Sequence, residues 1–114
     1  MRGNHQRVCA AIFVPKGQQP VFYFLIECPE LPKVQAYIAK VCKEHNKNFM
    51  VVTQMLDSMI RNPYPTRAEV NDIYHAVHQG ANALMLTGET AHGRYPVEAM
   101  KMLVETANGS LEEL

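Results

Sequence analysis

Two short apolar segments that each end on a threonine constrain what this chain can fold into. Residues 49–53 are Phe-Met-Val-Val-Thr and residues 83–87 are Ala-Leu-Met-Leu-Thr, and a segment with helical spacing follows each of them. Short buried strands that alternate with amphipathic helices predict an α/β fold with parallel strands and right-handed crossovers. In such folds the side chains at the carboxyl ends of the strands face the ligand, so Thr53 and Thr87 are the first candidate site residues.

Amphipathic helices are expected around these strands, and their ends carry known signals. The helices are predicted from Pro32 to about His45, from Thr66 to Gly80 and from Pro96 to Asn108. Thr66 is a good N-cap, and Glu69 completes a capping box three residues later. Gly80 is placed to end the same helix in a left-handed conformation, and Asn108-Gly109 is expected to stop the last helix.

Two further apolar segments precede the first helix. Residues 7–14 and 20–27 are rich in β-branched and aromatic side chains, and each is typical of a strand. The segment between them contains Pro15 and Gly17 and has hairpin length, so the pattern favours an N-terminal β-hairpin. Exposed strand edges invite association. Residues 1–28 could therefore cap one edge of the parallel strands, and edges left open predict self-association.

The charge balance and the cysteines argue against several classes of protein. The 11 basic and 11 acidic residues give no net charge, so we expect no binding to nucleic acid or to an anionic membrane. The three cysteines lack a C-x-x-C spacing, which argues against a disulfide framework and a zinc site and favours a reducing, cytoplasmic compartment. No segment approaches the length of about 20 apolar residues that crosses a bilayer.

His75 and His78 are one helical turn apart, a spacing at which two imidazoles can share a metal ion. No acidic residue or third histidine stands at a matching offset. A solvated helix face is therefore the favoured interpretation, and we assign no metal ligand in this sequence.

Three motifs in the later part of the chain resemble a known family. They are Thr-Gln-Met-Leu at residues 53–56, Pro-Thr-Arg-Ala-Glu at residues 65–69 and Met-Leu-Thr-Gly-Glu-Thr-Ala at residues 85–91. Together with their spacing, they resemble pyruvate kinase from about residue 28 to residue 107. The resemblance implies the last βα units of a TIM (β/α)8 barrel. A complete barrel takes about 250 residues, so 114 residues would hold only a part of one. The resulting division is an unmatched segment 1–28, a partial barrel 29–108 and a tail 109–114.

The resemblance also implies roles for individual residues. Thr53 would bind phosphoenolpyruvate close to the face on which the enolate is protonated, which makes it the candidate catalytic residue. Thr87, where the family usually has serine, would bind substrate, and His92 stands where many relatives have a lysine near the nucleotide. Arg67 and Glu69 lie on a helix that is close to a subunit contact in the family. We therefore expect a structural or interface role for these two residues at least as much as a role in ligand binding. The plain alternatives are a strand-terminal threonine bonded to nearby backbone and an ordinary turn.

The activity implied by the resemblance is that of a glycolytic transferase. It is phosphoryl transfer from phosphoenolpyruvate to ADP, giving pyruvate and ATP, with Mg²⁺ and K⁺ as cofactors. The resemblance places the metal ligands and a charge-stabilising lysine on strands that this sequence does not contain. The isolated chain is therefore expected to be inactive and to bind neither ion.

Two alternatives of other classes remain open at this point. One is a non-catalytic product, either a truncated or frameshifted gene or a small interaction module that reuses a barrel fragment. The other is a different phosphate-binding barrel enzyme whose catalytic groups come from a partner chain.

Overall fold

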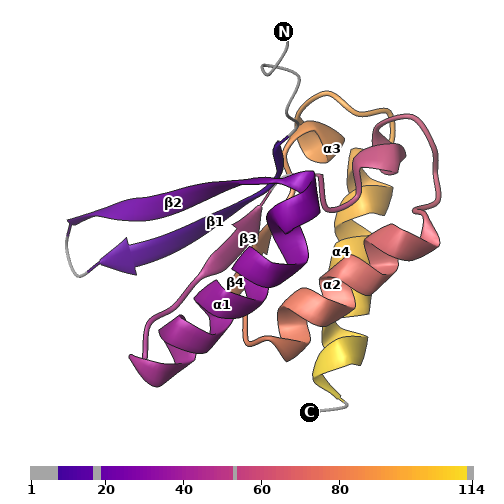
Figure 1. Cartoon of the computed structure of the whole chain (residues 1–114). Helices are drawn as coiled ribbons and strands as arrows, with labels where there is room; N and C mark the ends of the chain where they lie inside the picture. The colour runs from indigo at the N-terminus through magenta and orange to yellow at the C-terminus, as the bar shows by residue number, and fades with distance from the viewer. Residues whose placement is uncertain (1–7, 17–18, 53, 113–114) are drawn as a thin grey trace, which may run out of the picture.

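The structure of the chain is a computed structural model, which describes residues 8–16, 19–52 and 54–112. Its elements are β1 (Val8–Lys16), β2 (Gln19–Glu27), the 3₁₀ turn η2 (Cys28–Glu30), α1 (Leu31–Glu44), β3 (Met50–Val52), the 3₁₀ turn η3 (Asp57–Ile60), α2 (Arg67–His78), β4 (Ala83–Met85), α3 (Gly88–Ala91) and α4 (Pro96–Leu111). The strands form one sheet in the order β2-β1-β3-β4, with the helices packed beside it (Figure 1).

The two strands that end near the candidate threonines lie side by side and run in the same direction. β3 pairs with β4 in parallel register, with Met50 opposite Ala83 and Val52 opposite Met85. The connection between them passes through α2, as is usual for parallel neighbours. The prediction of an α/β fold with parallel strands is therefore confirmed, and the carboxyl ends of β3 and β4 meet at one edge of the sheet.

The opposite edge of β3 is occupied by β1, which runs antiparallel to it. Ala11 lies opposite Val52 and Phe13 lies opposite Met50, so the first residues of β1 extend past the carboxyl end of β3. β1 also pairs antiparallel with β2. Ile12 of β1 is fully buried and belongs to the main hydrophobic core. The segment before Pro29 thus covers one edge of β3, while residues 17 and 18 lie outside the described part of the chain.

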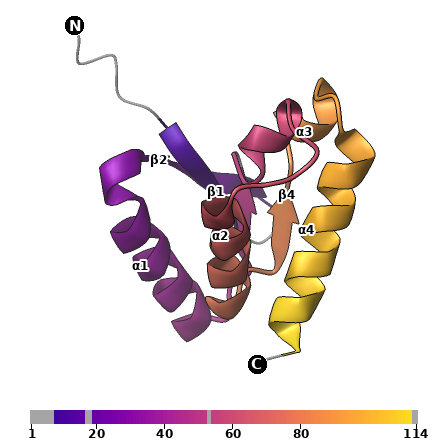
Figure 2. The same cartoon turned by 90° about the vertical axis from the view of Figure 1, so that its right-hand side faces the viewer.

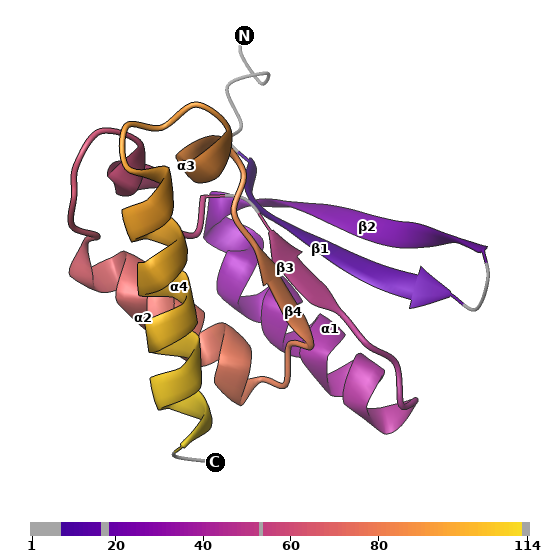
Figure 3. The ribbon, with the colours of Figure 1, turned by 180° about the vertical axis from the view of Figure 1, so that it is seen from behind.

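The core lies between the sheet and the helices. In Figure 2, α2 is seen between α1 and α4. In Figure 1, α1 lies in front of the strands, and in Figure 3, which shows the molecule from behind, it lies behind them. The three long helices α1, α2 and α4 contribute to one core cluster, for example through Ile38, Ile73 and Leu103. Burial of such side chains contributes about 1.5–3 kcal/mol each, which holds the short strands in register.

The ends of α2 follow the predicted signals closely. The Thr66 hydroxyl accepts a hydrogen bond from the Glu69 N–H at 3.2 Å, and the Glu69 carboxylate accepts one from the Thr66 N–H at 2.8 Å. At the other end Gly80 has a φ of +93°, and its N–H donates to the Val77 carbonyl at 3.0 Å. The capping box and the left-handed glycine are both confirmed.

The last helix differs from its prediction in length. α4 continues through Asn108-Gly109 and ends at Leu111, so the expected stop is wrong. A glycine in a helix costs only about 1 kcal/mol relative to alanine. Ser110 in the extra turn is buried, and its hydroxyl is satisfied because it donates to the Thr106 carbonyl at 2.7 Å. The helix therefore reaches into the range 109–114 that was expected to be a tail.

The apolar stripe predicted along α4 is only partly buried. Leu103 faces the core, whereas Val97, Met100 and Val104 are 61%, 45% and 47% exposed. Only part of this apolar stripe packs against α2. The remaining apolar side chains therefore lie on the outer side of α4. Among the described residues, we find no helix with the length and apolar character needed to cross a membrane.

Candidate functional site

The candidate site lies where the chain leaves β3 and β4. Thr53, the first candidate, lies outside the described residues; Val52 is the last residue of β3, and Gln54 is the next described residue. Gln54 has a φ of +55°, a left-handed conformation that is uncommon for a residue other than glycine and turns the chain sharply after the strand. Thr87 precedes α3 and follows β4 by two residues. The parallel pairing therefore brings Thr87 and Gln54 to the same edge of the sheet.

A buried carboxylate that sequence reasoning did not single out joins these two segments. Glu89 on α3 is only 1% exposed. Its Oε2 accepts a hydrogen bond from the Leu56 N–H at 2.9 Å, and its Oε1 accepts one from the Thr87 N–H at 2.9 Å. The sequence signal was weak, because an acidic residue in a first helical turn is common for local reasons. The contact to Leu56 spans 33 residues of chain and has no local signature.

The Thr87 side chain is half-buried and points toward the same carboxylate. Its Oγ1 lies 3.5 Å from Glu89 Oε1, which is longer than the usual range of about 2.5–3.0 Å for a hydrogen bond between two oxygens. The Thr87 carbonyl accepts hydrogen bonds from the N–H and the hydroxyl of Thr90 at 3.1 and 3.3 Å. The backbone N–H groups of Thr87 and Thr90 are therefore already satisfied within this turn.

His92 closes the short helix α3 and folds back over it. The His92 N–H donates to the Gly88 carbonyl at 3.1 Å. A Cβ atom added to Gly88 would lie 3.0 Å from His92 Nε2 and 3.2 Å from Ile60 Cδ1. The exposed His92 imidazole is thus at the outer side of the loop after β4, close to η3 but not among the groups that contact Glu89.

Arg67 and Glu69 lie farther out, at the start of α2. Glu69 accepts hydrogen bonds from the Ser58 N–H at 2.8 Å and from the Ser58 hydroxyl at 2.6 Å, in addition to closing the capping box. Its carboxylate therefore attaches η3 to the N-terminus of α2. Arg67 is exposed, and neither residue approaches Thr87 through a contact that the structure describes.

The histidine pair on α2 is not part of a metal centre within the described residues. There, no group of three or more His, Cys, Asp or Glu side chains is placed to hold a metal ion. His78 Nδ1 is 3.0 Å from the Tyr74 carbonyl oxygen, and its ring stacks on Tyr74 with centroids 4.0 Å apart. Asp72 stands one helical turn before His75, an acidic neighbour that sequence reasoning missed. The pKa of its carboxyl is raised, mainly by desolvation, while the His75 charge acts to lower it and the Glu69 charge to raise it. These groups lie along α2, away from the carboxyl ends of β3 and β4.

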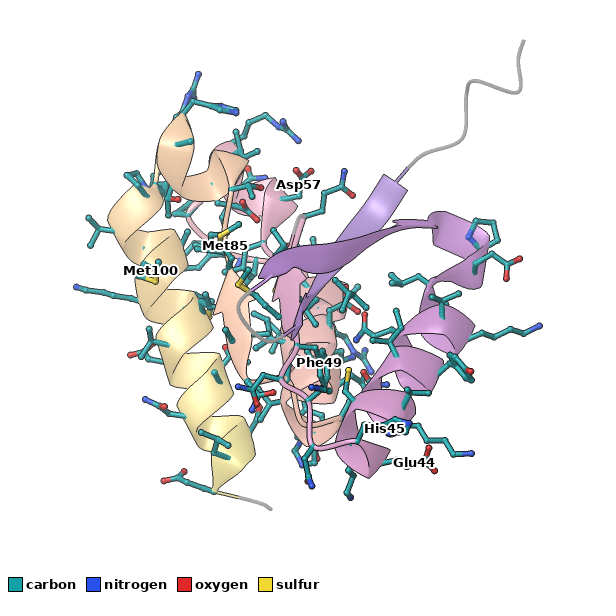
Figure 4. The ribbon with its side chains drawn as sticks, turned by 90° about the vertical axis from the view of Figure 1, so that its left-hand side faces the viewer. Glu44, His45, Phe49, Asp57, Met85 and Met100 are labelled. Carbon is teal, nitrogen blue, oxygen red and sulfur yellow. The ribbon has the colours of Figure 1, made fainter. Side chains whose placement is uncertain are left out.

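Two hollows in the described surface lie elsewhere. One, of about 370 Å³, is at the amino ends of β3 and β4 and is lined by residues such as Lys43, Phe49 and His78. The other, of about 320 Å³, runs between β4 and α4 and is lined by residues such as Leu84 and Val104. In Figure 4, Asp57 of η3 lies at one end of the molecule, and Glu44 and His45, at the end of α1, lie at the opposite end. Neither hollow includes Thr87 or Glu89.

Comparison with known proteins gives a consistent result. The sequence model of the family "Pyruvate kinase, barrel domain" matches residues 8–100. The chain is 44% identical over 103 residues to the pyruvate kinase of Chlamydia muridarum, which covers 88% of this chain and 21% of that protein. It is 45% identical over 108 residues to the pyruvate kinase of Thermotoga maritima, which covers 95% of this chain and 22% of that protein.

A solved structure of a pyruvate kinase from Cryptosporidium parvum has a related fold. It superposes with a TM-score of 0.75 at 32% sequence identity, over 79% of this chain and 18% of that chain. The chain thus spans about a fifth of the length of the curated relatives it matches.

The family model matches the chain from residue 8, whereas the motifs placed the start of the resemblance at about residue 28. The similarity therefore begins about 20 residues earlier in the chain than the motifs indicated. Residues 8–27 carry apolar strand patterns without a chemical motif, which is why inspection of motifs did not include them. The matched range contains all four strands and both loops at the carboxyl ends of β3 and β4. On these grounds the chain belongs to the pyruvate kinase family.

Proposed function

We propose that the loops after β3 and β4 form one wall of a pyruvate kinase active site, with Thr53 as the catalytic residue and Thr87 as a second residue that binds phosphoenolpyruvate. The observation that carries this proposal is the parallel register of β3 and β4, which brings both loops to one edge within the matched range. A hydroxyl at a strand end can donate to a carboxylate or a phosphate above the sheet. His92 is proposed to lie on the nucleotide side of this wall, and Arg67 and Glu69 to act as structural or interface residues.

In the complete enzyme, the proposed reaction is phosphoryl transfer from phosphoenolpyruvate to ADP, giving pyruvate and ATP in glycolysis. We propose that this chain corresponds to the last βα units of the (β/α)8 barrel. Mg²⁺ and K⁺ would supply charge neutralisation at the phosphate when bound. The described residues do not fit a magnesium site, because no suitable group of acidic residues is placed together and both oxygens of Glu89 already accept hydrogen bonds. We therefore propose no step through a metal on this chain alone, and its lack of activity stays a prediction.

The test uses the full 114-residue chain labelled with ¹⁵N and titrated with phosphoenolpyruvate. We expect the amide signals of Gln54, Thr87 and Gly88 to shift, while Gly80 at the opposite end of the sheet does not. Thr87→Val removes the hydroxyl at nearly constant shape and should weaken binding about tenfold, since a hydrogen bond to a charged group is worth about 1.5–3 kcal/mol. Thr106→Val, on α4, is the matched control and should leave the affinity unchanged.

A coupled assay for pyruvate completes this experiment. The chain with Mg²⁺, K⁺ and ADP should form no pyruvate, because most of the electrostatic stabilisation of the transition state would be absent. Metal-dependent pyruvate formation would overturn the predicted inactivity. Shifts confined to residues distant from Thr87 would overturn the proposed site itself.

A non-catalytic role is the second candidate, and the surface along β4 and α4 favours it. Within the described residues β4 pairs only with β3, so its other edge is open. The groove beside this edge is lined by no charged residue, and Met100 and Val104 are exposed next to it. We propose that a second copy of this chain covers this surface. In a two-fold dimer the open edge of β4 would pair with the β4 edge of the second copy, and the two uncharged apolar faces would pack against each other.

We also propose a reducing, cytoplasmic compartment. Cys42 is a free and buried thiol, and burial raises its pKa, so the thiolate that forms disulfides is disfavoured at this position.

A further inference from the structure

The Glu89 carboxylate is buried although its described partners carry no charge. A carboxylate that is 1% exposed has lost nearly all contact with water, which is costly unless hydrogen bonds replace the solvent. Here those bonds come from the backbone of Leu56 and Thr87, at 2.9 Å each. The two donors belong to the two loops of the candidate site, so the side chain connects one loop with the other.

From these contacts we propose that Glu89 is a positioning residue, which fixes the loop after β3 relative to Thr87 and sets the orientation of the Thr87 side chain. The proposal deepens the proposed function and rests on it for the identity of the ligand. Oε1 of Glu89 accepts from the Thr87 N–H and also lies 3.5 Å from Thr87 Oγ1. At 3.5 Å the Thr87 Oγ1 is beyond the usual O–H···O range of about 2.5–3.0 Å, so the contact places the side chain beside Glu89 and leaves its hydroxyl hydrogen free to donate to a ligand.

Other contacts hold the same two loops together farther from the strands. The Arg94 N–H donates to the Ile60 carbonyl at 2.9 Å, which ties the end of η3 to the segment after α3. Glu69 attaches Ser58 to the start of α2. Because these attachments remain when Glu89 is changed, the loss of its bonds should alter the geometry near Thr87 more than the stability of the whole fold.

A pair of matched substitutions separates positioning from general stabilisation. Glu89→Gln keeps the shape but replaces one acceptor oxygen by an N–H₂ group, which cannot accept from Leu56 or Thr87. Glu69→Gln makes the same chemical change at the other carboxylate that bridges this loop. The readouts are amide hydrogen exchange and the scalar couplings that report the Thr87 side-chain rotamer, both measured on the full chain.

In Glu89→Gln we expect the amides of Leu56 and Thr87 to exchange about tenfold faster, because a lost buried hydrogen bond costs about 1–3 kcal/mol, and the Thr87 couplings to become averaged. In Glu69→Gln we expect faster exchange at Ser58 and Thr66 with the Thr87 couplings unchanged. The proposal is overturned if Glu89→Gln accelerates exchange uniformly across the core, or if Thr87 keeps a single rotamer. Should Glu89→Gln fail to fold, Glu89→Asp replaces it, since the shorter side chain keeps the charge but does not reach both loops.

Titration with phosphoenolpyruvate distinguishes this inference from the proposed function. If the exchange and coupling results hold but phosphoenolpyruvate shifts no signal near Thr87 in the unmodified chain, the positioning role stands and the proposed site fails. If phosphoenolpyruvate binds near Thr87 with the same affinity in the unmodified chain and in Glu89→Gln, the proposed site stands and the positioning role is overturned.

Discussion

At the scale of single residues, the close approach between α3 and the loop after it depends on a glycine. A Cβ atom added to Gly93 would lie 2.6 Å from the Glu89 carbonyl oxygen and 3.2 Å from the Ile60 Cα. Both neighbours are backbone atoms, which cannot move aside as a flexible side chain would. The loops after β3 and β4 can therefore meet at this point only because residue 93 has no side chain.

Gly93→Ala should destabilise the fold by about 1–3 kcal/mol, the usual cost of forcing a methyl group into a packed site. The measurement is the free energy of unfolding in urea. Gly109→Ala is the matched control, because a Cβ atom there meets nothing within 4 Å and the residue lies within α4. That control should stabilise the chain by about 0.5–1 kcal/mol. Equal effects at the two positions would contradict the argument from close approach.

Residue-level prediction from the sequence worked where the partners are close in the chain. Thr66 and Glu69 are three residues apart, and their capping box was predicted and is present. The bond from Ser58 to Glu69 spans 11 residues and the bond from Leu56 to Glu89 spans 33, and neither was predicted. Such contacts depend on how the loops are brought together by the sheet, which local propensity does not encode.

At the scale of elements, patterns predicted the presence of strands and helices better than their ends and partners. The parallel pair β3 and β4 and both ends of α2 were predicted, because periodicity and capping signals are local. The end of α4 was not, since Ser110 in the added turn is buried against the rest of the fold, which local signals do not encode. The pairing of β1 with β3 could be suggested only from the need to cover an open edge.

Removal of residues 1–28 should lower solubility, because it exposes the edge of β3 that β1 covers and takes the buried Ile12 out of the core. The measurement is the soluble fraction after centrifugation over a range of protein concentrations. A shorter deletion of residues 1–7 leaves β1 intact and serves as the control. Unchanged solubility of the longer deletion would count against the role of β1 as a cap.

At the scale of the whole molecule, the two sides of the parallel pair β3 and β4 differ. On one side β1 and β2 extend the sheet beyond β3, and on the other side, within the described residues, β4 is the last strand. The exposed apolar side chains of α4 lie beside this open edge, and the groove between them is uncharged. A surface of this kind is costly to leave in water, which is the physical reason for proposing that a second copy covers it.

Self-association through this surface predicts a dimer whose population rises with protein concentration, measurable by sedimentation velocity. Two copies related by a two-fold axis would pair their β4 edges and bring their α4 faces together. Val104→Lys places a charge in the groove and should shift the chain to monomer, because the charge would be desolvated in the contact. Tyr37→Lys changes an exposed aromatic residue on α1, away from α4, and should leave the dimer intact. A chain that is monomeric at all concentrations, or a dimer that both variants weaken equally, would show that the open edge of β4 is not where two copies meet.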